Sequence, residues 1–157
     1  MGVLSRLGLY IRTLRHLKPI QIINRVERKL SPVTADLRPS PALRQDYANN
    51  FHIIERPKSF YGQGAFLFLN KKEKLSFPVG WNDPSLQKLW IYNLHYFEGL
   101  LNSDTDDAVK TALIEQWVDE NPPGQGNGWE PYPSSLRINN WIKWALSGGE
   151  LPESAVH

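Results

Sequence analysis

The sequence predicts a mainly α-helical protein that carries one small β-hairpin. Apolar residues recur at helical spacing in residues 1–30, and helix start and stop signals punctuate the chain from Trp81 onward. Two short apolar runs between residues 66 and 77 flank a polar stretch, as in a hairpin. A lone hairpin is only marginally stable, so we expect it to pack on the helices that follow it.

Length and composition limit the possible classes of protein. The chain has 157 residues, enough for one hydrophobic core, and its 41% hydrophobic and 22% charged residues are typical of a globular protein. It has no cysteine, which excludes disulfides, thiolate metal sites and cysteine nucleophiles. The net charge of +2 does not indicate nucleic-acid binding, and we expect no nucleic-acid partner. Arginines interrupt the early apolar residues, so we expect no signal peptide.

Residues 1–30 predict two short basic amphipathic helices. Seven basic residues and one acidic residue give this segment a net charge of +6, whereas residues 81–130 carry −7. Pro19 separates the two runs of apolar residues at helical spacing, which are Leu4, Leu7, Ile11, Leu14 and Leu17, then Ile22, Ile23, Val26 and Leu30. Such helices can dock on the same protein, lie on an anionic membrane or bind an anionic polymer. We expect docking rather than membrane contact, because solvated basic faces are common on surface helices.

Residues 31–80 predict a surface strap followed by the small hairpin. Few periodic apolar positions lie between the prolines of the strap, which are Pro32, Pro39, Pro41 and Pro57. In the hairpin, we expect Phe66–Leu69 and Leu75–Phe77 to be the strands and Asn70–Lys74 to be the turn.

Residues 81–157 predict three helices. Asp83 followed by Pro84 is a start signal, and the first helix should run to about Asn102. The second begins at the acids after Ser103, which suit the helix dipole, and ends at Asn121-Pro122. Its buried face should consist of Val109, Ala112, Leu113 and Trp117. The third runs from about Ser134 to Leu146, after a glycine-rich loop, and stops at Gly148-Gly149.

Two polar residues of the first helix are candidates for special roles. The helical period puts Asn93 in the middle of the apolar face, which comprises Leu86, Leu89, Trp90, Leu94, Phe97, Leu100 and Leu101. A buried amide needs a hydrogen-bond partner, either a neighbouring helix end or loop or a ligand. The same period puts His95 on the opposite, polar face. His95 and Glu98 have metal-ligand spacing, but two ligands do not make a site, and we expect no metal and no cofactor.

The third helix presents Arg137 between two tryptophans, Trp141 and Trp144, at spacings of four and seven. A guanidinium can stack on indoles and still bind a carboxylate, so Arg137 is either a partner of an acidic residue or a ligand-binding residue. The helical period predicts an apolar side that consists of Ile138, Trp141, Ile142 and Ala145, with Asn139, Asn140 and Lys143 on the polar side.

A loop with two aromatic residues precedes that helix. Prolines 131 and 133 hold Trp129 and Tyr132 in a fixed segment, after a glycine-rich stretch that lacks the lysine of a phosphate-binding loop. Rigid aromatic side chains on a loop either stack on flat ligand faces or cover the end of the helix.

Two long motifs identify a family. The segments LWIYNLHYF at Leu89–Phe97 and GWEPYPSSLRINNWIKW at Gly128–Trp144 resemble the heparinase II/III-like proteins, as does the basic start TLRHLKP at Thr13–Pro19. The resemblance covers most of the chain. It implies an N-terminal (α/α) toroid followed by a β-sandwich, and cleavage of uronate-containing polysaccharides by β-elimination. In that chemistry polar groups neutralise the carboxylate while a base removes a proton and an acid protonates the leaving oxygen.

The resemblance also implies that the proton-transfer residues lie outside this chain. The catalytic Asn-His pair and the catalytic tyrosine of the family follow the Ser-Leu-Arg segment, and this sequence has no Asn-His dipeptide. We therefore expect residues 81–157 to be the first helices of an incomplete (α/α) toroid, inactive alone, whose partners are an acidic polysaccharide and the remainder of the toroid and β-sandwich. We expect no catalytic residue here, and sugar contacts from Arg137, Asn140, Trp129 and Tyr132, with Asn93 as support. The alternatives are a non-catalytic acidic-glycan-binding module and peripheral membrane attachment through residues 1–30.

Overall fold

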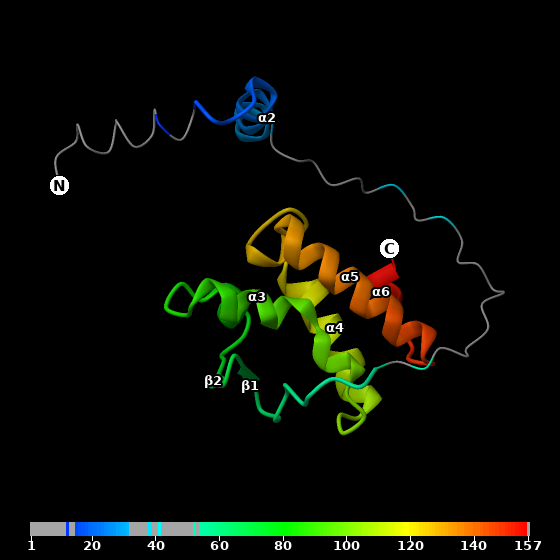
Figure 1. The fold of residues 1–157 in the computed structure, drawn as a ribbon. Helices are drawn as coiled ribbons and strands as arrows, with labels where there is room; N and C mark the ends of the chain where they lie inside the picture. Colours follow the sequence, from blue (N-terminus) through cyan, green and yellow to red (C-terminus); the bar gives the residue numbers. More distant parts are fainter. Residues whose placement is uncertain are drawn as a thin grey trace. The chain divides into compact units, whose positions relative to one another are not determined.

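The computed structural model describes residues 12, 15–31, 38, 41, 52 and 54–156. The chain divides into two compact units, Met1–Asp36 and Leu37–His157 (Figure 1). The first of the two predicted N-terminal helices and most of the predicted strap lie outside the described residues, apart from single positions. The second predicted helix is α2, Pro19–Leu30, in the first unit.

The hairpin is present, but its turn differs from the prediction. Strands β1 (Ala65–Phe68) and β2 (Lys71–Lys74) pair antiparallel, with Phe68 opposite Lys71. Leu69 and Asn70 form the turn, both with positive φ, as in the tight two-residue hairpins that match strand twist. The second strand therefore consists of Lys71–Lys74, which the prediction assigned to the turn. Because these charged side chains are mostly exposed, no apolar alternation marks that strand in the sequence.

The first predicted helix of the second unit is shorter than expected. A short 3-10 helix, η1 (Val79–Asn82), precedes α3, which spans Lys88–Tyr96. Phe97 ends α3 in the left-handed conformation, and a second 3-10 helix, η2 (Glu98–Leu101), follows it. Asp83 does accept a hydrogen bond from the Ser85 backbone N–H at 2.8 Å, but it organises a turn rather than the start of the helix.

Helix α4, Asp107–Glu120, begins at the predicted acids. Asp106 is its N-cap, and the Oδ1 atom of Asp106 accepts a hydrogen bond from the Ala108 backbone N–H at 2.8 Å. The predicted buried face is right in part. Trp117 is buried and Leu113 packs half-buried against the core, whereas Val109 and Ala112 are exposed. Lys110 and Ile114 are buried in their place, so the buried side of α4 is turned away from Val109.

Helix α5 begins three residues before the predicted start. It spans Pro131–Leu146, after the short 3-10 helix η3 (Asn127–Trp129), and the four-residue α6 (Glu153–Val156) follows it. Proline suits the first position of a helix, because its fixed φ is already helical and its missing N–H leaves no unpaired donor. Gly148, with a φ of 102°, lies just beyond the C-terminal end, as expected.

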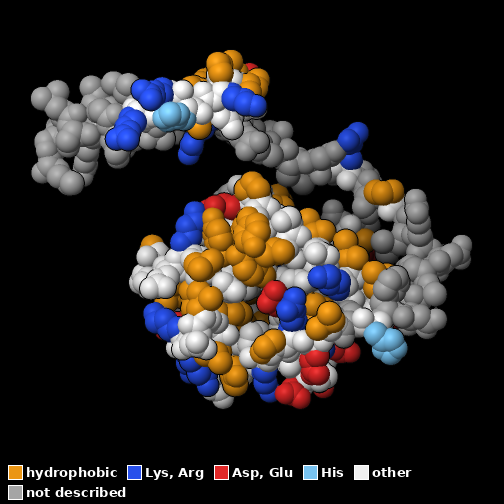
Figure 2. Space-filling model, in the orientation of Figure 1, with side chains coloured by type: hydrophobic (Ala, Val, Ile, Leu, Met, Phe, Trp, Pro, Cys, Tyr) orange, Lys and Arg blue, Asp and Glu red, His pale blue; other side chains and the backbone are white. Residues whose placement is uncertain are grey.

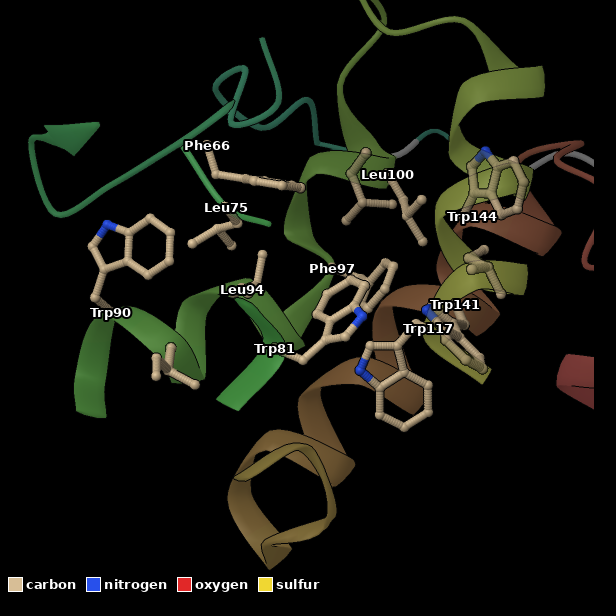
Figure 3. Close-up of a cluster of buried hydrophobic side chains, with 13 residues drawn as sticks. Phe66, Leu75, Trp81, Trp90, Leu94, Phe97, Leu100, Trp117, Trp141 and Trp144 are labelled. Carbon is tan, nitrogen blue, oxygen red and sulfur yellow. The ribbon is translucent and has the colours of Figure 1, made fainter. Parts of the chain in front are cut away.

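Aromatic residues dominate the core of the second unit. Figure 3 shows Trp81, Phe97, Trp117 and Trp141 converging between α3, α4 and α5, with Trp90 and Phe66 toward the hairpin. The Phe97 and Trp141 rings lie edge to face, 5.6 Å apart, as do the Trp117 and Trp141 rings, 5.8 Å apart. The predicted fold class, mainly α with a small β-hairpin, is confirmed, and the hairpin packs on this core as expected.

Candidate functional site

Arg137 lies in a cage of three tryptophans. Its guanidinium carbon is 3.7 Å from the ring centroid of Trp117, 5.1 Å from that of Trp129 and 5.7 Å from that of Trp141. Nη1 of Arg137 donates a hydrogen bond to the backbone carbonyl oxygen of Gly128. We call Arg137 and these three tryptophans the arginine cage. Its members come from α4, η3 and α5, so it joins the two ends of the loop that connects α4 to α5.

The arginine cage is closed to solvent. Arg137 is only 2% exposed, and its burial lowers its pKa to about 10 because desolvation disfavours the charged form. In this conformation the guanidinium therefore lies against indole faces and donates to a carbonyl oxygen, instead of pairing with an acidic residue, which was one of the two alternatives that the sequence left. Its role in the described structure is to hold the loop before α5 against α4.

Two further predicted sugar-contact residues also have internal partners. Asn140 is buried, and its Nδ2 donates a hydrogen bond to the Tyr96 backbone carbonyl at 2.8 Å, which links α5 to the end of α3. Trp129 is half-buried, and its indole N–H donates to the Asn121 carbonyl at 3.0 Å. Of the two interpretations of its loop, Trp129 therefore fits the one in which an aromatic side chain covers a helix end.

His95 is at the centre of the core, so its predicted position on a polar face is wrong. The ring is 0% exposed. Its Nε2 is 2.8 Å from the Trp81 carbonyl oxygen, and its Nδ1 accepts a hydrogen bond from the Trp117 indole N–H at 2.9 Å. These two partners require a neutral ring with the proton on Nε2. Burial lowers its pKa to about 4, and the charge of Arg137 adds to that shift.

Gly128 explains why the His95 and arginine cage residues can lie so close together. A Cβ atom at this position would be 2.6 Å from His95 Nδ1 and 2.9 Å from the Trp117 ring. Only glycine leaves room for both rings and still presents its carbonyl oxygen to Arg137.

Tyr132 is the one predicted sugar-contact residue that is well exposed. It lies in the first turn of α5, its side chain is 60% exposed, and its ring meets that of Tyr96 edge to face at 5.7 Å. Tyr96 is buried, and that burial raises its pKa to about 12, so it stays neutral at physiological pH. Tyr132 therefore packs against the buried Tyr96 ring and leaves much of its own ring exposed to solvent.

A polar cluster that the sequence analysis missed adjoins Tyr132. Glu130 accepts hydrogen bonds from Lys88 Nζ, at 2.7 Å, and from the Tyr92 hydroxyl, and the Lys88 ammonium lies 5.2 Å from the centroid of the Tyr92 ring. Burial acts to raise the pKa of Glu130, but the bonds from Lys88 and Tyr92 outweigh it and leave that pKa below its ordinary value. We call Lys88, Tyr92, Glu130 and Tyr132 the tyrosine surface. The signal in the sequence was the i, i+4 spacing of Lys88 and Tyr92.

Asn93 lies beside the tyrosine surface in sequence but not among its partners. Its Nδ2 donates to the Leu89 carbonyl at 2.8 Å, within α3, and its side chain is partly exposed. The expectation that it lies in the middle of the apolar face is wrong. The buried side of α3 consists of Trp90, Ile91, Leu94 and His95, so the helix is turned away from the predicted orientation, and Leu89 is exposed.

Neither of two cavities among the described residues is lined by any of the five predicted site residues. One is a small apolar cavity of about 30 Å³ among Phe60, Phe66 and Trp81. The other is an open cleft of about 570 Å³ between the start of α4 and the end of α5, and three of its lining residues are acidic: Glu55, Asp106 and Asp107. Lys110, the one basic residue there, is already paired with Asp107 at 2.7 Å.

The described residues hold no group of three or more histidine, aspartate or glutamate side chains placed to bind one metal ion. Within the same residues, every helix is too short or too polar to cross a bilayer.

Comparison with known proteins gave no match. No protein-family model, no curated protein and no solved structure is similar to this chain.

Proposed function

We propose that this chain forms the first helices of a heparinase II/III-like polysaccharide lyase, where it contributes a wall of the substrate cleft. The reaction is β-elimination on a uronate-containing polysaccharide. The groups that move protons belong to elements that this chain does not contain, so the chain alone is inactive. The (α/α) toroid is part of this proposal.

The observation that carries the proposal is the way the two family-like motifs fold together. The first motif is most of α3, and the second is η3 with most of α5. They are joined by the bond from Asn140 to the Tyr96 carbonyl and by the bond from the Tyr92 hydroxyl to Glu130. Residues that carry the resemblance thus support each other in one packed unit, which is expected if they serve a common structural purpose.

The outer side of α5 also supports an incomplete helical assembly. Ile138 and Ile142 were predicted to face the core, but they are 53% and 50% exposed. Figure 2 shows hydrophobic side chains gathered on the face over α5. An apolar stripe of this kind on a helix that is already packed on its other side is typical of a surface that another element covers.

The tyrosine surface is the proposed contact point for the sugar. Tyr132 offers an exposed aromatic face, Tyr92 a hydroxyl, and Lys88 a cation that can reach a uronate carboxylate when it leaves Glu130. The open cleft beside α4 is the poorer choice, because Glu55, Asp106 and Asp107 would repel an acidic chain. Of the sugar-contact residues expected from the sequence, the proposal keeps Tyr132 and assigns Arg137, Asn140 and Trp129 to its support.

The test combines an activity assay with affinity electrophoresis. We expect the purified chain to generate no unsaturated uronate ends from alginate, heparin or chondroitin sulfate, but to migrate more slowly in gels that contain one of them. Tyr132→Ala should abolish that retardation, whereas Ile142→Ala, at a residue that is 50% exposed on the same helix, should not. Clear turnover by the chain alone would contradict the proposal that the proton-transfer residues lie in elements other than this chain. Equal mobility in every glycan would contradict the sugar contact.

A non-catalytic acidic-glycan-binding module is the second candidate. It is favoured by the same exposed Tyr132 on its buried aromatic base, which needs no further domain to bind a sugar. The two candidates differ in one measurement. If the chain is a complete binding module, its affinity for an acidic glycan should be unchanged when the downstream part of a lyase is supplied in trans. If the chain is instead one wall of a lyase cleft, the same addition should increase its affinity or produce activity.

A further inference from the structure

Helix α2 has an apolar stripe along its whole length. At 100° per residue, the stripe covers nearly half of the helix circumference, and its side chains are between 38% and 76% exposed: Ile20, Ile22, Ile23, Val26 and Leu30. Gln21, Asn24 and Arg25 lie on the opposite side and are exposed as well. The helix is thus divided into a mainly aliphatic half, in which Glu27 lies between Ile20 and Ile23, and a polar half.

The ends of α2 are defined by its own residues. The Lys18 backbone N–H donates to Gln21 Oε1 at 2.9 Å, and Pro19 occupies the first turn. At the other end, the Ser31 N–H donates to the Glu27 carbonyl at 2.7 Å. These bonds between neighbouring residues define both ends of α2. The apolar stripe therefore belongs to a helix whose limits are set by its own sequence.

Basic side chains surround this stripe. Arg12, Arg15 and Lys18 precede the helix and are exposed, and Arg25 lies on its polar half. With only Glu27 as an acid, residues 1–30 have a net charge of +6. A surface that is to cover this helix must therefore be apolar in its depth and negatively charged at its rim.

We infer that α2 binds the surface of an anionic phospholipid membrane and lies in its interface, independently of any glycan site. Lipid headgroups match the basic rim, and acyl chains accept an aliphatic stripe of any detailed shape. An acidic polysaccharide or nucleic acid would match the charge alone and leave the stripe in water. Two copies of this segment would bring two net charges of +6 together, which disfavours self-pairing through the same stripe.

The test measures flotation of the full chain with two kinds of vesicle, phosphatidylcholine alone and phosphatidylcholine with one third phosphatidylglycerol. We expect binding to the mixed vesicles, little binding to the neutral ones, and release at high salt. Circular dichroism should show that helix content is retained or increased on binding. Equal binding to neutral vesicles, salt-independent binding, or no binding to either vesicle would overturn the inference.

Two variants separate insertion of the stripe from the effect of charge. Val26→Asp puts a carboxylate on the apolar half, and the matched control Asn24→Asp puts the same charge on the polar half. Val26→Asp should lower partitioning by at least about tenfold relative to Asn24→Asp, since it removes a buried aliphatic side chain from the interface. Ile23→Ser, which adds no charge, should also weaken binding more than Asn24→Asp does. Equal partitioning of the three variants would overturn the inference.

Discussion

Two ionisable side chains, Arg137 and His95, lie inside the tryptophan cluster and both contact Trp117. They share one environment, yet one is a buried cation and the other a neutral ring. Three indole faces and the Gly128 carbonyl stabilise the Arg137 cation, whereas the neutral His95 ring makes one hydrogen bond at each of its nitrogens. A protonated His95 would direct a second donor at the Trp117 indole N–H and would also face Arg137.

The pH dependence of stability follows from the His95 pKa. Its pKa is about 4 in the folded chain and 6.5 when unperturbed, so the unfolded chain binds the extra proton first. The contribution of His95 to stability is complete above pH 6.5 and is lost as the pH falls through the range from 6.5 to about 4. The expected loss is about 3 kcal/mol in the free energy of unfolding.

Denaturant unfolding at a series of pH values measures this loss. His95→Gln keeps a neutral donor and acceptor but does not titrate, so its unfolding free energy should vary less over the same range. His52→Gln, at an exposed position, is the control and should keep the full pH dependence of the unmodified chain. The same slope for His95→Gln and the unmodified chain would show that His95 is not the titrating group.

The structural role of Arg137 can be separated from a ligand-binding role by stability alone. Arg137→Ala should lower the free energy of unfolding by about 3 kcal/mol, because it leaves a cavity among three indoles and removes one of the two hydrogen bonds to the Gly128 carbonyl, the other being donated by the Ser134 hydroxyl. Arg137→Lys should also destabilise, since an ammonium cannot stack as a planar guanidinium does. Asn139→Ala, on the exposed side of α5, should stay within about 0.5 kcal/mol. An unchanged stability in Arg137→Ala would favour the ligand role.

Among the helices, α4 shows which sequence signals are reliable. Its start at Asp106 and its end at Asn121 follow from capping and proline rules that depend on neighbouring residues only. Its buried face does not, because that face depends on what packs against it. Val109 and Leu113 gave the stronger apolar periodicity, but the position of Trp117 against His95 and Arg137 turned Lys110 and Ile114 inward.

The N-cap of α4 gives a local test of stability. Asp106→Ala should lower the free energy of unfolding by about 1 kcal/mol, because the Ala108 N–H loses its acceptor at the positive end of the helix dipole. Thermal unfolding measures this loss of stability, and Asp104→Ala is the control, since it removes the same charge two residues earlier. Equal shifts in the two variants would mean that charge, not the cap, matters at this end.

Helix α5 shows a larger failure of periodicity, with a clear physical cause. Of the predicted apolar side, Trp141 is buried as expected, but Ile138 and Ile142 are exposed, and residues 137, 140 and 144 are buried in their place. Two indoles bury more apolar area than two isoleucines, and Arg137 and Asn140 both find backbone carbonyl partners. Sequence reasoning assigned the polar residues outward because it could not foresee those carbonyls. The pattern Arg-x-x-Asn-Trp-x-x-Trp, at spacings of three, four and seven, was itself the signal of the buried face.

Across the whole chain, the division into two units predicts independent stability. The aromatic core lies within residues 37–157, so a chain that begins at Leu37 should keep its near-ultraviolet circular dichroism and its unfolding midpoint. The same deletion should remove all binding to anionic vesicles. A midpoint that falls by more than a few degrees would mean that residues 1–36 contribute to the stability of the second unit.

We propose that the buried arginine cage holds the scaffold while the tyrosine surface contacts the sugar. The most direct measurement is a nuclear magnetic resonance titration of the full chain with a uronate oligosaccharide. We expect the largest shift changes at the amides of Tyr92, Glu130 and Tyr132, with the indole N–H signals of Trp117 and Trp141 nearly unchanged. Large shifts at those indoles and at the Arg137 side chain, with none at Tyr132, would contradict it.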